Sequence, residues 1–578
     1  MIHRGRAVAL VTLALAATAV WPVSAWAHAA LLRTTPQASG TVNGSPAQVT
    51  LTYDEAVEPR FAVVSVTDAA GHQQISGPPH ALATDPKTLA VPVSRLTAGW
   101  YLVYWRVISA DGHPVRGAFT FAVGPNPGPA PQFAVPSLAE SAATPRLVAA
   151  RWLAFLTLMV AVGLFVFRAL IARRAAPVAP AGTRAVALAC VGATMLALLA
   201  LPVYVFVATA EFALRPVTDV SGLVPLMRSS ALGRAYLDLE VVVALFAGAA
   251  LVAVRLDRPE RPARSVAELL ALTGAMLSAA SALLVPGLAG HAAQTSPVGL
   301  SLALDWLHMA AGSIWLGGLI GLSLLAWRTP AGHRMEVLGR VVPRFSRTAL
   351  GSVLVIIASG VGATVIHMPT LASLWETSYG QAILVKVGLL CAALVLGGLN
   401  FARSTPRLAA ALARRDARLA ASAAALLRRL IGGEITIVAG IVLAAMVLTS
   451  LPPPAKALGE LGQVSARVGP GAVHETVHHG SYRVGIAIDP NRAAQPSMFQ
   501  VTVTQHGAPV RGATVIAHFA MLDMEMGQQA YVLPEQAPGV YRRSMPALVM
   551  VGHWGLSFEI QPRGTAPFTV IVVDHAEG

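Results

Sequence analysis

Charge and cysteine are both scarce in this chain of 578 residues. Only 12% of the residues are charged, against roughly 25% in soluble domains, and the mean hydropathy is +0.62. These values exclude an ordinary soluble protein and predict a multi-span membrane protein. The two cysteines, Cys190 and Cys391, both fall in apolar segments, which excludes a disulfide framework and a CxxC metal site. Any metal ligands must therefore be His, Met, Asp, Glu or a terminal amine.

Acidic residues are outnumbered, with 28 Asp and Glu against 42 Lys and Arg, so the formal net charge is +14. Such a balance can indicate nucleic-acid binding, but most of the arginines lie between apolar segments. We interpret them as topology signals and expect no nucleic-acid partner. The sequence has no phosphate-binding loop, no nucleophile elbow and no internal repeat, and we expect no enzyme activity.

The N-terminus has the pattern of a signal peptide. Arg4 and Arg6 precede a short apolar run, and the segment ends in Ala25-Trp26-Ala27, the small-residue pattern that signal peptidase requires. Cleavage of residues 1–27 would make His28 the first residue of the mature protein. An uncleaved anchor followed by an ordinary loop histidine is the alternative.

The predicted fold class is mixed: a polytopic all-α membrane bundle of eight helices flanked by two small extracytoplasmic β-sandwich domains. Short Val-, Thr- and aromatic-rich stretches separated by turn residues fill residues 28–124 and recur in residues 470–578, which indicates a small sandwich in each segment. A Pro/Gly linker covers residues 125–145. The membrane domain is expected over residues 146–452.

Eight apolar segments in this domain reach the roughly 20 residues that a bilayer helix needs. They lie at residues 147–168, 185–210, 235–254, 266–288, 301–326, 348–367, 380–402 and 432–451. If the first sandwich is outside the cytoplasm, the predicted inner connections hold 20 arginines and the outer ones 3. This asymmetry fits the positive-inside rule, and it predicts a bacterial inner-membrane protein with both sandwiches on the periplasmic side.

Three residues of the first sandwich are candidate metal ligands. A mature N-terminal His28 offers its amine and its imidazole to one ion, and the sequence DGHP supplies Asp111 and His113, which point to one face of an extended strand. Together they form a tetragonal N,O set, the geometry that favours Cu(II). Alternatively, His113 only caps an Asp-Gly turn.

The motifs of this domain resemble a known family. HAALLRTTPQASGTV, VTLTYDEAVEP and WRVISADGHPVRGAFTFAVG are similar to the periplasmic copper-binding CopC family, and AGHAAQTSP and DWLHMAAGSIWLGGL resemble the CopD copper-resistance membrane family. The resemblance implies a CopC–CopD fusion with a Cu(II) site at His28, Asp111 and His113, and a role in copper import or resistance. No methionine occurs between Thr52 and Asp111, so the Met-rich Cu(I) motif of some CopC proteins is absent.

The apolar segments carry a few residues that suit copper. Ionisable residues inside a membrane are expensive and indicate function by default, and imidazole with thioether suits copper, especially Cu(I). We expect a membrane copper path near the outer face at His291, His308, Met309, His367 and Met368. The alternative is that His291 and His367 are interfacial residues and that His308 hydrogen-bonds a neighbouring helix. Lys386, at a similar depth, is expected to have a structural or gating role.

The last domain holds a methionine cluster. HFAMLDMEMG resembles the YtkA-like domains, and it predicts a Cu(I) site formed by His518, Met521, Met524 and Met526. These methionines could equally fill a sandwich core. The histidine-rich stretch HETVHH, residues 474–479, is interpreted as a solvated linker.

The predicted function is therefore capture of Cu(II) outside the cytoplasm and passage of copper to or across the membrane. Copper ions and the lipid bilayer are the expected partners, with periplasmic cuproproteins or copper chaperones as candidates. Two alternatives remain open: a haem-containing membrane redox protein, which needs two histidines at matched depth on facing helices, and a membrane-anchored copper chaperone for cuproprotein assembly.

Overall fold

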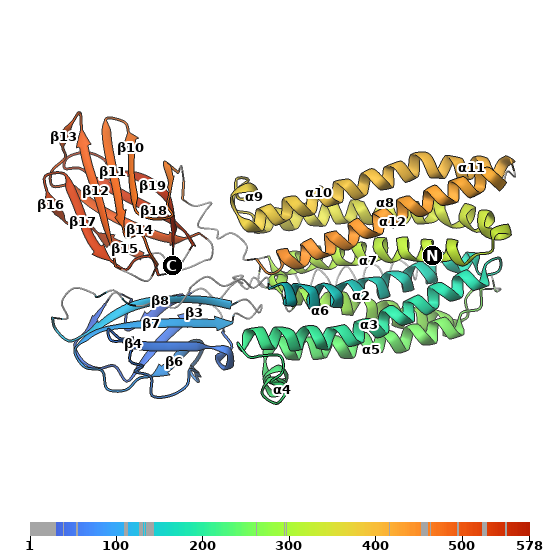
Figure 1. Ribbon diagram of the computed structural model, residues 1–578, viewed down its shortest axis with the longest axis horizontal. Coiled ribbons are helices and arrows are strands. Elements are labelled where there is room, and N and C mark those ends of the chain that lie inside the picture. The colour runs from blue at the N-terminus through green and yellow to red at the C-terminus, as the bar shows by residue number, and fades with distance from the viewer. Residues whose placement is uncertain are drawn as a thin grey trace, which may run out of the picture. The chain divides into compact units, whose positions relative to one another are not determined.

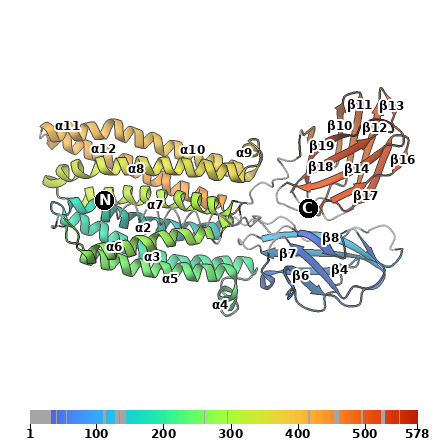
Figure 2. The same cartoon turned by 180° about the vertical axis from the view of Figure 1, so that it is seen from behind.

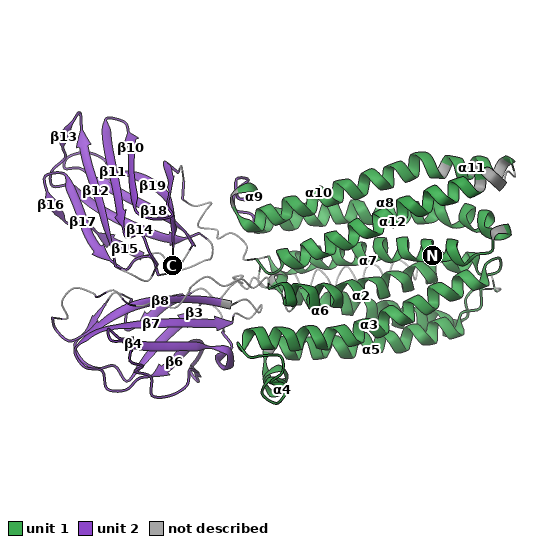
Figure 3. Ribbon diagram, in the orientation of Figure 1, with its two compact units in different colours: residues 1–25, 143–367, 374–451 green, residues 26–142, 368–373, 452–578 purple. Residues whose placement is uncertain are grey.

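The computed structural model describes most of the chain after residue 30. Its gaps are residues 39, 54–55, 109–113, 127–130, 132, 134–143, 260, 262, 289, 294, 296, 415–416, 452–460, 463, 494–495, 523–528, 550–551 and 578. The described residues divide into two units (Figure 3). One unit is helical and comprises the described residues within 143–367 and 374–451. The other unit contains the strands of both sandwiches. Each unit is described by itself below.

The helical unit confirms the predicted membrane bundle. Among the described residues, eight helices are long and apolar enough to cross a bilayer, and Figures 1 and 2 show them side by side with their axes roughly parallel. They belong to α2 (Pro145–Leu170), α3 (Pro180–Phe212), α5 (Ala231–Leu256), α6 (Val266–Leu288), α7 (Val298–Arg328), α8 (Ala331–His367), α10 (Ser378–Leu399) and α12 (Ala417–Leu448). The shorter α4 (Val220–Ser229), α9 (Ser373–Glu376) and α11 (Thr405–Arg414) connect them.

Several helices run further than the apolar segments predict. The sequence analysis begins one helix at residue 348, but α8 begins at Ala331 and is 37 residues long, about 55 Å at 1.5 Å per residue. The hydrocarbon core of a bilayer is about 30 Å thick. The arginines predicted in a loop, from Arg334 to Arg347, therefore lie on helical turns, because arginine is a good helix former and the helix continues through Pro343.

A close helix contact joins α2 to α7 through two glycines. A Cβ atom added to Gly163 would lie 1.9 Å from the backbone oxygen of Ser313, and one added to Gly317 would lie 2.3 Å from the backbone carbon of Gly163. Small residues permit such close backbone approach, which is a main source of helix association in membranes. Glycine is therefore required on both sides of this contact, and it fixes α7 against α2.

The first sandwich consists of two four-stranded sheets. One has the order β1-β3-β6-β5 and the other β2-β8-β7-β4. Inward-facing residues such as Val49, Leu51 and Trp105 are fully buried between them, as the alternation in the sequence predicts. The strands are β1 (Leu31–Thr35), β2 (Thr41–Val42), β3 (Gln48–Tyr53), β4 (Val63–Asp68), β5 (His80–Leu82), β6 (Asp85–Pro92), β7 (Gly99–Ile108) and β8 (Pro114–Val123).

The second sandwich pairs a sheet of order β10-β11-β12-β17-β16, with β13 added to β12, with a sheet of order β15-β14-β18-β19-β9. Its strands are β9 (Ala466–Val468), β10 (Val473–His479), β11 (Tyr482–Asp489), β12 (Ser497–Gln505), β13 (Ala508–Pro509), β14 (Thr514–Met521), β15 (Gln529–Val532), β16 (Glu535–Ala537), β17 (Val540–Met545), β18 (Gly552–Gln561) and β19 (Phe568–Ala576).

The interpretation of residues 474–479 as a linker is wrong. These residues belong to β10, which pairs with β11 along its whole length. Val473 and Val477 are buried in the core, and the ring of His479 stacks on Phe568 with 4.7 Å between centroids. The sequence pattern did not indicate this strand, because only its two valines are apolar and three of its seven residues are histidines.

Candidate functional site

The ligands predicted in the first sandwich, His28, Asp111 and His113, lie outside the described residues. The strands next to them are described. β7 and β8 form an antiparallel hairpin whose last pair is Ile108 with Pro114, so the segment with the DGHP motif connects these two strand ends. β1 begins at Leu31, three residues after His28.

Contacts between the strands bring these ends to one end of the sandwich. Leu31 pairs with Tyr53 at the end of β3, and the Tyr53 ring packs edge-on against Trp105 of β7 with 5.7 Å between centroids. The backbone N–H of Glu58 donates to the carbonyl of Ile108. Burial raises the pKa of the Tyr53 hydroxyl well above its ordinary value, so this side chain is neutral. The start of β1 and the strand ends at Ile108 and Pro114 therefore lie at the same end of the domain.

In the helical unit, His308 lies on α7 and contacts α8. Its Nδ1 is 3.0 Å from the hydroxyl oxygen of Ser359, and that hydroxyl donates its own proton to the carbonyl of Val355 at 2.6 Å. The oxygen of Ser359 therefore accepts a hydrogen bond from Nδ1–H. This places the lone pair of the neutral imidazole on Nε2, the tautomer in which an outer hydrogen bond orients a metal-binding histidine.

Charged residues that surround His308 were only partly predicted. Lys386 of α10 interacts electrostatically with His308 and with Asp305 of α7. Asp305 also interacts electrostatically with Tyr379 of α10. Its Oδ2 would lie 2.8 Å from a Cβ atom added to Gly287, near the end of α6. Asp305 was missed in the sequence analysis, although it is three residues before His308 and so lies on the same helix face. We call Asp305, His308, Ser359 and Lys386 the intramembrane cluster.

The other members of the predicted membrane path do not join this cluster in the same way. Met309 is one position further along α7, about 100° around the helix from His308. His367, the last residue of α8, uses both ring nitrogens: Nδ1 donates to the carbonyl of Ala363 at 2.8 Å, and Nε2 is 3.1 Å from the hydroxyl of Thr295. Met368 follows it directly in the chain.

His291 begins a short 3-10 turn, His291–Ala293, and its side chain is outside the description. No group of three or more His, Cys, Asp or Glu side chains is arranged to hold a metal ion within the described ranges. In the same ranges, a serine and not a second histidine is the hydrogen-bond partner of His308.

Two of the ligands predicted for the C-terminal site, His518 and Met521, lie on the same strand, β14. Met521 is 2% exposed and packs in the sandwich core, whereas His518 is partly exposed with its Nε2 3.5 Å from a carboxylate oxygen of Glu559. The two residues lie on opposite faces of β14 and are not brought together. Met524 and Met526 lie outside the described residues.

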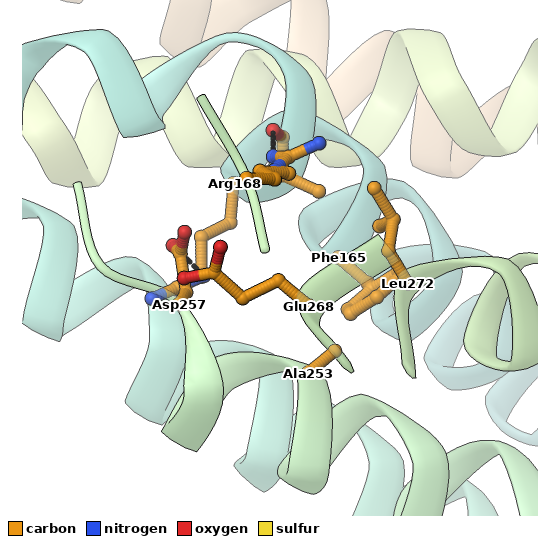
Figure 4. A pocket seen from close by; sticks show the side chains of 8 residues that line it. Phe165, Arg168, Ala253, Asp257, Glu268 and Leu272 are labelled. Atoms are coloured by element: carbon orange, nitrogen blue, oxygen red, sulfur yellow. Dashed lines mark hydrogen bonds and ion pairs between the residues drawn. The ribbon is translucent and has the colours of Figure 1, made fainter. Parts of the chain in front are cut away.

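At the other end of the helical unit from the intramembrane cluster, charged residues fasten the helix ends together. Asp257, just after α5, accepts ion pairs from Arg168 at 3.0 Å and from Arg173 at 2.7 Å. Glu268 in the first turn of α6 accepts the backbone N–H groups of Arg258 and Ser265. Figure 4 shows Arg168, Asp257 and Glu268 around a small pocket. Because its charges are paired, we assign this cluster to holding α2, α5 and α6 in place.

The fold and these sites define a multi-pass membrane protein with two β-sandwich domains. Three family models match it in order: the CopC domain at residues 31–124, Copper resistance protein D at residues 339–448 and YtkA-like at residues 477–559. In sequence order, the chain therefore carries a CopC domain, a segment of the copper resistance protein D type and a YtkA-like segment, the arrangement of a CopC–CopD fusion.

Known relatives are similar over different parts of the chain. The copper transport protein CutJ of Bacillus subtilis (strain 168) is 27% identical over 542 residues, which cover 92% of this chain and 93% of that protein. Copper resistance protein C of Pseudomonas syringae pv. tomato is 36% identical over 105 residues, 17% of this chain and 82% of that protein. The crystal structure of CopC from Methylosinus trichosporium OB3b is 32% identical and covers 18% of this chain and 99% of that chain, with a TM-score of 0.16.

Proposed function

We propose that this protein captures Cu(II) outside the cytoplasm and passes copper into or across the bacterial inner membrane. Residues 1–27 would be removed as a signal peptide, and residues 28–124 would bind Cu(II) through His28, Asp111 and His113. The described strands support this assignment, because the start of β1 and the strand ends at Ile108 and Pro114 lie at one end of the sandwich. The terminal amine, two imidazoles and a carboxylate would form the chelate at this end.

The membrane part of the path would centre on His308. The single observation that carries the proposal is the hydrogen bond from its Nδ1–H to Ser359, which leaves Nε2 able to bind an ion in the hydrocarbon region. Met309, Met368 and His291 would offer further soft or imidazole ligands toward the outer face. His367 would join them by giving up the hydrogen bond between its Nε2 and the hydroxyl of Thr295. A cation near Lys386 is disfavoured by like charge, and the carboxylate of Asp305 offsets this repulsion.

The arginine distribution supports the orientation. The connections that hold 20 arginines lie at the same end as the ion pairs of Asp257, and the positive-inside rule assigns that end to the cytoplasm. With an even number of spans, both sandwiches would be periplasmic. The intramembrane cluster, at the opposite end, would then be the first part of the bundle that copper meets.

The test measures copper in cells and Cu(II) on the purified full-length protein. We compare wild type with His113→Ala, His308→Gln and, as a matched control, His506→Gln in the turn after β12. His113→Ala is expected to lower Cu(II) affinity and to change cytoplasmic copper, whereas His308→Gln should change cytoplasmic copper and leave Cu(II) affinity intact. The sign of the change gives the direction of movement.

Two outcomes would contradict the proposal. Unaltered Cu(II) affinity in His113→Ala would show that the first site is assigned to the wrong residues. Unaltered cytoplasmic copper in His308→Gln would show that the bundle is only an anchor, as in the chaperone alternative.

A further inference from the structure

Two histidines of the second sandwich converge on its outer surface. Nε2 of His553 and Nδ1 of His575 are 3.1 Å apart, and the rings meet edge to face with 4.6 Å between centroids. Both side chains are partly exposed. Neither residue belongs to the copper sites proposed above.

The register of the sheet causes this meeting. β18 and β19, adjacent in Figures 1 and 2, are antiparallel, and His553 is directly opposite His575. The next pair, Trp554 with Asp574, faces the other way and is buried in the sandwich. Directly opposite residues of antiparallel strands have Cβ atoms about 4.5–5.5 Å apart, so two imidazoles at such a pair can reach one ion.

The separation of the two nitrogens fits a shared metal ion. Metal–nitrogen bonds to histidine are about 2.0–2.1 Å long, so two nitrogens 3.1 Å apart would bind one ion with an N–metal–N angle of about 100°. That angle lies between the values for square-planar and tetrahedral centres. A metal ion can therefore be bound by both nitrogens after a turn of the rings, without a change of strand register.

A buried carboxylate lies beside the pair. Asp574 is 0% exposed, accepts a hydrogen bond from the side-chain amide of Asn491 at 2.9 Å, and interacts electrostatically with His553. Asn491 is also fully buried, and its side-chain amide donates a second hydrogen bond to the carbonyl of Gly471 at 2.9 Å. This brace fixes β19 next to His575 and provides negative charge that favours a cation on the two rings.

We propose that His553 and His575 form a second extracytoplasmic copper site, with Cu(II) bound by the two imidazoles and its remaining positions open to water or to a ligand from a partner. The choice of copper over other divalent ions rests on the proposed function and on the order of metal affinities, in which Cu(II) binds nitrogen ligands most tightly. An open site on a surface suits transfer of the ion, whereas a closed one would retain it.

The experiment uses the full-length protein with His28→Ala and His113→Ala, which removes the first site. Equilibrium titration with Cu(II) and electron paramagnetic resonance are expected to show one remaining copper per chain with two imidazole nitrogens. Adding His553→Gln or His575→Gln should weaken this copper by at least the roughly 10–100-fold that loss of an outer-shell partner costs at a metal site. His518→Gln, on the same sheet but beside Glu559, is the matched control and should not change it.

The proposal is overturned if His553→Gln and His575→Gln bind Cu(II) as the parent does, or if the spectrum lacks two nitrogens while both histidines are present. A melting curve for each variant separates loss of ligand from loss of fold: reduced binding with an unchanged melting temperature supports the site, and the two-nitrogen spectrum of the parent tests it without mutation. Failure of the first site is distinguishable, since it would appear as unaltered binding in His113→Ala alone.

Discussion

Replacing Gly317 by alanine tests the helix contact that supports the intramembrane cluster. The added Cβ would lie 2.3 Å from the backbone carbon of Gly163 and 2.4 Å from its Cα, far inside the ordinary contact distance between carbon atoms of about 3.5–4.0 Å. Backbone atoms on both sides cannot move away as a flexible side chain could. The whole of α7 must therefore shift from α2 by about 1 Å.

The expected cost follows from overpacking. Extra methyl groups in a well-packed core cost typically about 1–3 kcal/mol, and at about 2–4 °C per kcal/mol the melting temperature of the helical unit should fall by about 5 °C. The assay is a thermal scan in detergent, followed by tryptophan fluorescence. Gly192→Ala on α3 is the control, because nothing lies within 4 Å of its added Cβ.

A second arm tests whether the two glycines report one contact. Gly163→Ala should cost at least as much as Gly317→Ala, since its Cβ would meet the Ser313 oxygen at 1.9 Å. Because either change separates the same pair of helices, the double variant should lose less than the sum of the two. If Gly317→Ala and Gly192→Ala have the same melting temperature, the close contact between α2 and α7 is refuted.

Three further predictions concern the clusters of charge and hydrogen bonds. Ser359→Ala removes the acceptor that orients His308 and should reduce copper transport by roughly 10–100-fold; an unchanged rate in whole-cell uptake would argue against the tautomer assigned to His308. Asp305→Asn leaves Lys386 without its carboxylate in the bundle and should reduce folded yield, whereas Asp305→Asn with Lys386→Met should restore it, as measured by size-exclusion chromatography; equal yields would mean that the two charges are not coupled. Backbone N–H groups of Gly512 and Gly539 donate to Glu535 and hold its pKa below the ordinary value, so its contribution to stability is present above the unfolded pKa and is lost as the pH falls through the folded one. Glu535→Gln should therefore lower the melting temperature of the second sandwich at pH 7 and have little effect near pH 3, and an equal loss at both pH values would contradict this origin.

The helices were predictable in number but not in length. Hydropathy identifies the part of a helix that lies in hydrocarbon, and this part is what the eight apolar segments record. Beyond it, arginine-rich turns such as those from Arg334 to Arg347 continue the helix without an apolar signal. The apolar pattern in the sequence therefore marks where a helix leaves the hydrocarbon, and it does not mark where the helix ends.

The candidate sites show the same division between local and long-range information. Parity along a strand already separates His518 from Met521, because residues three apart face opposite ways, so this prediction could have been improved from sequence alone. Asp305 carries a local signal too, as an acid inside an apolar segment three residues before His308. By contrast, the meeting of His553 with His575 depends on the register of β18 and β19, which no local pattern specifies. The partnership of His308 with Ser359 depends likewise on how α7 and α8 pack.

The glycine seam between α2 and α7 determines which helices are free to rearrange. Two backbones in such close contact can neither slide nor rotate past each other without a clash. The helices α2 and α7 should therefore move as one rigid body, which fixes the depth of His308 in the bundle. The hydroxyl of Ser359 and the ammonium of Lys386 approach His308 from α8 and α10, which are not part of this rigid pair. Any rocking that admits and releases an ion is therefore expected in α8 and α10, with the imidazole standing still while its surroundings change.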